Sequence, residues 1–299
     1  MKTFLLLTKR NTKLFFKDKG MFFTSLITPI ILLVLYATFL FNVYYDSFLQ
    51  AIPPEIQIMD SNLKGIVGGQ LVSSLLAVCC VTVAFCSNML MVQDKVTGAR
   101  KDLTVTPVKN STMALSYYVS SVISTLIICL IAAVAGFIYL ANVGWFLSAD
   151  DVLCILLDVV LLVLFGTALS SVINYFLSSQ GQISAVGSII SAGYGFICGA
   201  YMPISQFSEG LQKVLSFLPG TYATSLLRNH AMRGAFAELN KLGFPEEVIN
   251  NMKSTVDCNI EFFGKIVSTN AMYAILAVSV IVLIAAYILI NMFVKIKNK

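Results

Sequence analysis

The residues whose chemistry could support catalysis or metal binding are few and lie far apart in this sequence. The single histidine, His230, stands beside Arg228 and Asn229, with no acidic or cysteine residue at a catalytic spacing. Six of the seven cysteines lie in apolar runs, where cysteine behaves as a small hydrophobic residue, and only Cys258 lies in a polar segment. The sequence therefore predicts no catalytic group, no metal site and no disulfide between exposed cysteines. We expect His230 to be an ordinary surface residue.

Nucleotide binding through a P-loop is also excluded. A P-loop has the pattern G-x-x-x-x-G-K-[ST], in which backbone amides cradle the phosphates and the lysine reaches them. The one Gly-Lys pair of the chain, Gly264-Lys265, has Asn259 at the position of the first glycine and Ile266 in place of Ser or Thr. Active transport by this protein would therefore need an energy source on a separate polypeptide.

The composition places most of the chain in a membrane. Charged residues make up 12% of the sequence, well below the share of about 25% in soluble domains. Hydrophobic residues make up 58%, and the mean hydropathy is +0.84. Since a spanning helix needs about 20 mainly apolar residues, we predict an all-α integral membrane protein with six spans. The predicted spans are residues 21–43, 66–91, 114–141, 152–176, 183–203 and 271–294.

The distribution of Lys and Arg predicts the orientation, because cytosolic loops carry the excess of positive charge. With the N-terminus inside, segments 1–20, 92–113, 177–182 and 295–299 are cytosolic and hold 13 of the 20 basic residues. Six of the other seven lie in one long external segment, 204–270. We predict a multi-pass protein of the plasma (inner) membrane with both termini in the cytosol.

Residues 1–20 are predicted to form an amphipathic helix at the inner membrane surface, ahead of a transmembrane domain over 21–299. At about 100° per residue, Phe4, Leu7, Leu14 and Phe15 share one face, and lysines occupy the opposite one. Such a helix suits the interface of an anionic leaflet. The alternative is a simple orientation signal before the first span. The basic candidates for contact with headgroups or a cytosolic partner are Lys9, Arg10, Lys13 and Lys17.

The longest cytosolic connection, residues 92–113, contains more charged and turn residues than are needed to set the orientation in the membrane. It combines both signs of charge with Gly98 as a helix break and with Pro107, which biases Thr106 away from helix. We predict a short helix, with turn residues at both ends, that docks into a cleft of another protein; a solvated basic loop is the alternative. The candidate docking residues are Asp94, Lys95, Gly98, Arg100, Lys101, Asp102, Thr106 and Pro107.

The fifth predicted span carries a stripe of small residues at i, i+4 spacing, and such stripes let helix backbones approach closely. The stripe consists of Gly187, Ser191, Gly195 and Gly199. It either packs against another helix of the same subunit or lines a dimer seam or a transport pathway.

Asp158 is the one ionisable residue well within a predicted span. It lies about six residues, or roughly 9 Å, from the outer end of its helix. Intramembrane carboxylates are candidates for function. A proton- or cation-linked role and an interfacial or pore-facing carboxylate are the two alternatives.

The external segment 204–270 is predicted to begin with an amphipathic helix over residues 208–217 that dips toward the bilayer. Leucine and valine recur there at helical spacing, between two prolines. We expect the rest of the segment to form a small helical cap. The residues assigned to this outer helix are Pro203, Leu211, Val214, Leu215, Leu218 and Pro219.

Two motifs resemble the membrane subunits of type-2 ATP-binding-cassette (ABC) exporters. In the 92–113 loop, Asp94-Lys95-Val96-Thr97-Gly98 and Leu103-Thr104-Val105-Thr106-Pro107-Val108 are similar to that family's charged turn and its Leu…Thr-Pro-Val ending. Residues 199–228, GAYMPISQFSEGLQKVLSFLPGTYATSLLR, resemble the segment after the family's fifth helix. The resemblance implies a dimer with a second copy or a paralogue, an outer helix that seals the exit, and a separate ATPase subunit that grips the loop. It also implies no cofactor in this chain, with ATP and Mg bound by the ATPase.

Together these observations predict an export permease driven by a separate ATPase. A secondary transporter or channel is the alternative, but the sequence shows no repeat, almost no buried charge and no candidate selectivity ring. A membrane-embedded enzyme would need a nucleophile–base pair or a metal set. The apolar, Phe-rich spans favour an amphipathic or lipophilic cargo such as a drug, lipid or peptide, and nucleic acid is not expected as a partner.

Overall fold

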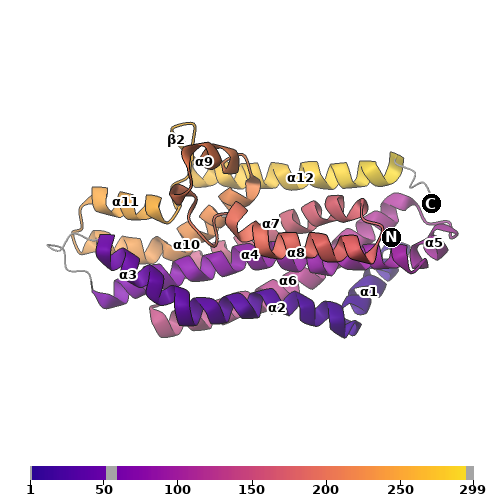
Figure 1. Ribbon diagram of the computed structural model, residues 1–299, viewed down its shortest axis with the longest axis horizontal. Coiled ribbons are helices and arrows are strands. Elements are labelled where there is room, and N and C mark those ends of the chain that lie inside the picture. The colour runs from indigo at the N-terminus through magenta and orange to yellow at the C-terminus, as the bar shows by residue number, and fades with distance from the viewer. Residues whose placement is uncertain (1, 52–58, 294–299) are drawn as a thin grey trace.

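Long helices run side by side along the longest axis of the molecule (Figure 1). The structure is a computed structural model that describes residues 2–51 and 59–293. Its first half consists of α1 (Lys2–Lys17), α2 (Lys19–Leu35), the π-helix η1 (Tyr36–Leu40), α3 (Phe41–Ala51), α4 (Asp60–Val96), α5 (Ala99–Thr104) and α6 (Asn110–Val143). The second half consists of α7 (Ala149–Tyr175), α8 (Gln180–Ile197), the 3-10 helix η2 (Ile204–Gln206), α9 (Glu209–Leu215), α10 (Pro219–Lys241), α11 (Glu246–Thr255), the hairpin strands β1 (Glu261–Phe262) and β2 (Lys265–Ile266), and α12 (Thr269–Phe293).

Local capping fixes several of these boundaries. The Asp18 carboxylate accepts a hydrogen bond from the Met21 amide at 3.1 Å, which ends α1 and starts α2. Before α7, Ser148 and Asp151 form a capping box: the Ser148 hydroxyl accepts from the Asp151 amide, and the Asp151 carboxylate accepts from the Ser148 amide. The amphipathic N-terminal segment is therefore a separate helix, set at an angle to the first long one (Figure 1).

Helix α4 forms the centre of the bundle, packed against α2, α6, α7, α8 and α10. Almost all of its side chains are buried, as expected for a helix that is apolar on every face. Small residues permit this crowding. A Cβ atom at Gly69 would lie 2.8 Å from the carbonyl oxygen of Ala231 on α10, so only glycine allows this approach.

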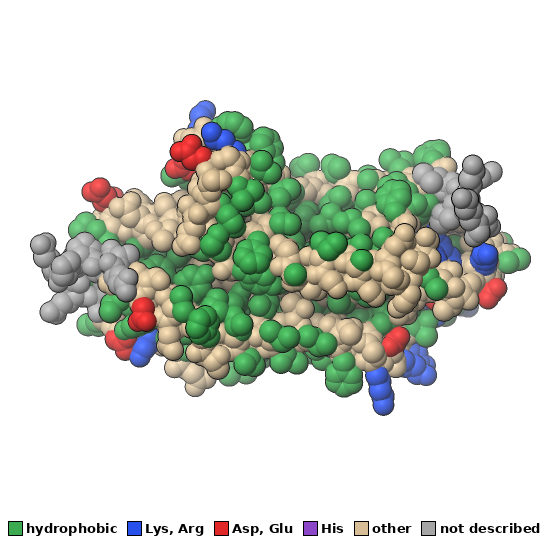
Figure 2. Space-filling model, viewed as in Figure 1, with side chains coloured by type: hydrophobic (Ala, Val, Ile, Leu, Met, Phe, Trp, Pro, Cys, Tyr) green, Lys and Arg blue, Asp and Glu red, His purple; other side chains and the backbone are tan. Residues whose placement is uncertain are grey.

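Five helices in the described part of the chain are long and apolar enough to cross a membrane: Lys19–Leu49, Asp60–Val96, Asn110–Val143, Ala149–Tyr175 and Thr269–Phe293. These correspond to five of the six predicted spans, so the all-α membrane fold is confirmed. Residue 294, at the end of the sixth predicted span, lies outside the described residues. Figure 2 shows apolar side chains over the middle of the visible face, with charged side chains toward the two ends and on the lobe formed by α9 and the hairpin.

The fifth predicted span, 183–203, is not one of these five. Helix α8 ends at Ile197, because Gly199 adopts a left-handed φ of +76°. The Ala200 amide donates to the Gly195 carbonyl at 2.8 Å and the Gly199 amide to the Phe196 carbonyl at 3.3 Å, which is a Schellman stop. Helix α8 is also rich in Gly, Ser and Gln. The prediction from the sequence extended this helix beyond Ile197, to residue 203.

The start of α1, helix α5 and the end of α12 lie at one end of the molecule, called here the α5 end; α3 and α11 lie at the other (Figure 1). This arrangement agrees with chain termini on one side of the membrane. That this side is cytosolic stays a prediction, and the lysines at 295, 297 and 299 that support it lie outside the described residues.

The segment 204–270 is not a small cap. Its main element, α10, is a 23-residue helix with one continuous buried face, packed against α4, α7 and α12. The alternation of small and polar residues along α10 lowers its hydropathy without preventing burial. The shorter α9 and α11 and the hairpin surround it on the outside of the bundle (Figure 1).

Candidate functional site

Asp94 lies in the last turn of α4 rather than in a loop, and it is buried. Its carboxylate accepts hydrogen bonds from the Arg10 guanidinium at 2.7 Å and from the Tyr117 hydroxyl at 2.5 Å. The hydrogen bond to Asp94 raises the pKa of Arg10. Asp94 therefore ties α1 and α6 to α4, and its carboxylate is already occupied inside the protein. Its role in docking stays a prediction that this geometry does not support.

Lys95 is likewise turned inward. Its ammonium group donates to the carbonyl of Tyr175, to that of Leu177 at 3.2 Å and to that of Asn174 at 3.4 Å. These are carbonyls at the C-terminus of α7, where the helix leaves acceptors unpaired and the dipole favours a cation. Lys95 thus fastens α4 to α7, and the prediction that it contacts a partner is not supported.

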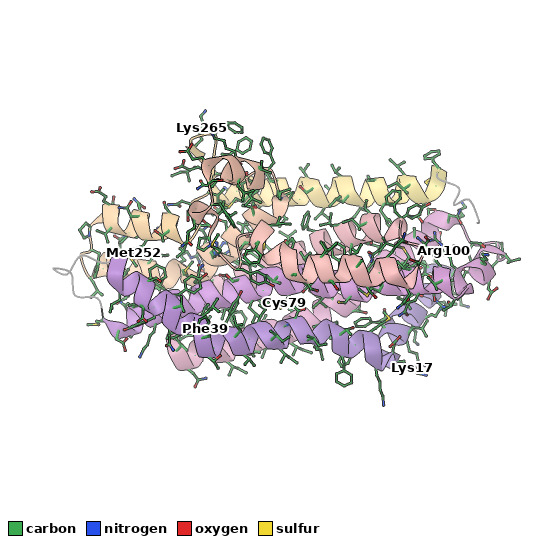
Figure 3. All side chains as sticks on the ribbon, viewed as in Figure 1. Lys17, Phe39, Cys79, Arg100, Met252 and Lys265 are labelled. Atoms are coloured by element: carbon green, nitrogen blue, oxygen red, sulfur yellow. The ribbon has the colours of Figure 1, made fainter. Side chains whose placement is uncertain are left out.

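Helix α5 follows Gly98, which has a left-handed φ of +85° and turns the chain out of α4. Arg100 lies at the same end of the molecule as α5 (Figure 3). It donates to the Asn291 amide oxygen of α12 at 3.1 Å and lies over the Tyr175 ring at 5.9 Å. The following residues face outward, and the Val105 side chain is 86% exposed. The exposed docking candidates are Lys101, Asp102, Thr106 and Pro107.

The N-terminal helix packs its predicted apolar face on protein. Phe15 is buried and α1 lies along α6, while Leu5 and Leu6 on another side are about three-fifths exposed. Lys9, Lys13 and Lys17 are exposed, whereas Arg10 is bound to Asp94. Contact of this helix with the membrane surface stays a prediction.

The small-residue stripe of α8 is covered by this chain's own side chains. A Cβ atom at Gly187 would lie 2.9 Å from Met89, one at Gly195 would lie 2.3 Å from the Tyr201 ring, and Gly199 is outside the helix. Ser191 is half-buried, and its carbonyl accepts from Tyr201. The structure therefore shows internal packing, and a dimer seam along this stripe is not supported.

Asp158 has two partners, and His230 is not a surface residue. The Asp158 side chain is 2% exposed and His230 is 7% exposed. The His230 Nδ1 lies 2.6 Å from one carboxylate oxygen, and the Tyr273 hydroxyl donates to the other at 2.7 Å. Asp158 is therefore the hydrogen-bond partner of both side chains. The expectation of an unpartnered surface histidine is wrong, because α7, α10 and α12 bring together residues remote in the sequence.

A buried ion pair fixes the segment after α8. Arg228 is 0% exposed; it lies 3.0 Å from the Asp257 carboxylate and donates to the Gly199 carbonyl at 2.6 Å. Asp257 also accepts from the amides of Ile204 and Ser205. Sequence reasoning noted Arg228 only as the end of the 199–228 motif and missed Asp257, for which no local signal exists.

A helix within residues 208–217 is confirmed as α9, which is shorter than predicted, and its position on the outer side stays a prediction. Leu215 is buried, while Leu211, Val214 and Leu218 are exposed. The exposed apolar surface continues at Phe217, whose ring meets those of Phe262 and Phe263 in the hairpin. Pro203 is buried and Pro219 is the first residue of α10. Sealing of an exit by α9 stays a prediction.

A cavity of about 850 Å³ lies between the first span and α11. Its walls come from α2, η1 and α3 on one side, and from the end of α8, residues 201–206 and α11 on the other. Met252 of α11 lines it at the end of the molecule opposite Arg100 (Figure 3). The lining residues are Leu32, Leu35, Tyr36, Leu40, Val43, Tyr44, Ser47, Phe48, Phe196, Tyr201, Met202, Pro203, Gln206, Val248, Asn251, Met252, Thr255 and Val256. The cavity was not foreseen, because it is formed by segments distant in the sequence.

Comparison with known protein families assigns the chain. Residues 2–231 match the ABC-2 type transporter family, and the chain belongs to this family. The match runs from α1 into α10 and includes both motifs on which the resemblance to type-2 ABC membrane subunits rests. No curated protein sequence matches the chain. The protein is therefore a membrane component, or permease, of an ABC transporter.

Proposed function

We propose that this permease is the membrane half of an ABC exporter and that a separate ATPase subunit docks on residues 97–109. The proposal rests on the geometry of the α5 end. One short exposed helix leads directly into a set of buried contacts, in which Asp94 meets α1 and α6, Lys95 meets α7, and Arg100 meets α12. A displacement of α5 is therefore transmitted to α1, α6, α7 and α12 together.

This geometry divides the predicted docking residues into two groups. Lys101, Asp102, Thr106 and Pro107 are exposed and free to contact an ATPase. Arg100 instead transmits the motion through Asn291 and the Tyr175 ring. In this proposal the α5 end faces the cytosol of the inner membrane, and ATP and Mg are bound by the ATPase.

The cavity supports a lipophilic or amphipathic cargo. Its volume of about 850 Å³ lies within the ~300–1,000 Å³ range of ligand pockets. Its lining is mainly apolar and aromatic, and the π-helix η1 contributes Tyr36 and Leu40. Short π-helical stretches occur frequently at functional sites. We propose that cargo occupies this cavity on its way to the outer side.

We also propose that two such subunits, identical or paralogous, form the working permease. The small-residue stripe that was expected to form the dimer seam is internal, but α8 has a second, exposed face that supports a dimer. That face is made of small residues with one isoleucine: Ser184, Ala185, Ser188, Ile189 and Ala192. Small residues allow close approach of a second helix.

The test is purification of the tagged protein from its native membrane in mild detergent, with its companions identified by mass spectrometry. A stoichiometric P-loop ATPase is expected. Lys101→Glu should remove the ATPase, because a surface charge at the docking helix is reversed. Lys213→Glu, at an exposed lysine of α9, is the matched control and should retain it. Arg100→Gln should retain the ATPase but lose cargo-stimulated hydrolysis.

Absence of any ATPase from the wild-type preparation would refute the proposal and favour an ATP-independent transporter. Retention of the ATPase by Lys101→Glu at wild-type stoichiometry would refute the docking surface alone. Gel filtration of each variant verifies that the membrane domain is folded.

A further inference from the structure

Tyr36, Tyr44 and Tyr201 line the cavity, and their hydroxyl groups differ in whether they have a hydrogen-bond partner within the described residues. The Tyr44 hydroxyl donates to the Tyr201 carbonyl at 3.2 Å, and the Tyr201 hydroxyl donates to the Ser191 carbonyl at 3.3 Å. The Tyr36 side chain is 3% exposed, and its hydroxyl has no hydrogen-bond partner among residues 2–51 and 59–293. A buried hydroxyl without a partner is costly, so it needs an explanation where a chain keeps one.

Tyr36 begins the π-helix η1, and both Tyr36 and Leu40 of this helix line the cavity. A hydroxyl group can donate and accept a hydrogen bond. An unpaired donor and acceptor therefore lies in the wall of a mainly apolar cavity.

The charges around the cavity restrict what this set can bind. Within the described residues, no Lys, Arg, Asp or Glu lines the cavity, and its polar lining consists of hydroxyl and amide groups. The buried ion pair nearby, Arg228 and Asp257, is closed on itself at 3.0 Å and engaged with backbone groups. A carboxylate, phosphate or ammonium group entering here would lose its hydration without gaining a counter-charge. A hydroxyl, amide or carbonyl group would find a hydrogen-bond partner in the Tyr36 hydroxyl.

We propose that the cavity selects amphiphiles whose polar group is uncharged, and that the Tyr36 hydroxyl hydrogen-bonds this group. The inference rests on the proposed function in taking the cavity as the cargo site. It narrows the cargo from lipophilic compounds in general to neutral ones that carry a hydroxyl, amide or carbonyl group. Tyr36 is the residue that determines this specificity.

The experiment is equilibrium binding of three radiolabelled probes with the same alkyl chain to the purified protein in nanodiscs. The probes are 1-monolaurin with a neutral diol, laurate with a carboxylate and dodecyltrimethylammonium with a cation. Monolaurin should bind about tenfold or more tightly than either charged probe, because only the charged heads are desolvated without a partner. Tyr36→Phe should weaken monolaurin binding about two- to tenfold, as expected for one net hydrogen bond, and leave the charged probes unchanged.

One further variant makes the result specific. Tyr201→Phe is the matched control, because that hydroxyl is already committed to Ser191, and it should leave the preference for the neutral head unchanged. Wild-type gel-filtration behaviour verifies the fold of each variant.

The inference is overturned if laurate or dodecyltrimethylammonium binds as tightly as monolaurin, if none of the probes binds, or if Tyr36→Phe binds monolaurin like the wild type. The binding measurement requires no ATPase. If the permease purifies without an ATPase yet selects the neutral head, only the proposed exporter function is refuted. If it purifies with an ATPase yet binds the three probes without selection, only this inference is refuted.

Discussion

Removal of the Asp158 carboxylate should destabilise the protein strongly, because that group is the shared hydrogen-bond partner of two buried side chains. Asp158→Ala leaves His230 Nδ1 and the Tyr273 hydroxyl without the partners that they have at 2.6 and 2.7 Å. An unpaired buried donor costs about 1–3 kcal/mol, so the loss of both predicts a decrease of about 2–6 kcal/mol in unfolding free energy. Asp158→Asn retains one carbonyl acceptor of similar shape, and we expect about half of that loss.

The assay is thermal unfolding of the purified protein in one fixed detergent, at matched protein concentration. Asp150→Ala is the control, since Asp150 is an exposed carboxylate in the first turn of the same helix and should change stability little. The double variant Asp158→Ala with His230→Phe should lose less than the two single variants summed, because both remove the same hydrogen bond. An Asp158→Ala protein that unfolds at the wild-type temperature would refute this reasoning and restore the view of Asp158 as a group that faces water.

Three other substitutions test the packing and the α5 end. Gly234→Ala should abolish folding or lower the unfolding temperature sharply, because its Cβ atom would lie 1.8 Å from the Phe146 carbonyl oxygen. Gly193→Ala, which adds a Cβ atom with nothing within 4 Å, should be neutral or stabilise by up to about 1 kcal/mol, and equal behaviour of the two variants would contradict the packing. Lys95→Met removes the donor to the α7 C-terminus, so amide exchange in the last turn of α7 should become faster; unchanged exchange would show that Lys95 does not hold that end.

The spans could be predicted because each is a long apolar run, and length and hydropathy are local properties. Helix ends could not be predicted as well. Asp94 and Lys95 appeared to belong to a polar loop, yet α4 continues through them because Arg10, Tyr117 and the end of α7 supply their partners. No window of sequence contains those partners, since they lie 23 to 84 positions away.

The same limit explains the errors at the candidate site. His230 was interpreted from its neighbours along the chain, whereas its partner Asp158 is 72 positions away. Helix α10 was interpreted as part of an external cap because its hydropathy is low. Its polar residues are buried all the same, since Arg228 finds Asp257 and His230 finds Asp158. The resemblance of two motifs, one in the α5 region and one over residues 199–228, predicted the family correctly. A family motif reflects the whole fold, including contacts between residues that are distant in the sequence.

The contacts at the two ends of the bundle involve the same helices, and they connect α5 to the cavity. At the α5 end, Lys95 holds α7 and Arg100 holds α12. Toward the other end, Asp158 joins α7 and α12 to α10. Helix α10 in turn holds the segment around residue 204 through Arg228 and Asp257.

These contacts connect one wall of the cavity to α5, while the other wall belongs to the first span. The Tyr44 hydroxyl bridges the two walls by its hydrogen bond to the Tyr201 carbonyl. The net contribution of such a bond is only about 0.5–1.5 kcal/mol, less than the cost of about 3–5 kcal/mol for breaking a buried ion pair. We infer that the walls separate at this bond when α5 is displaced, and that Asp158→Ala would weaken the transmission of that displacement to the cavity.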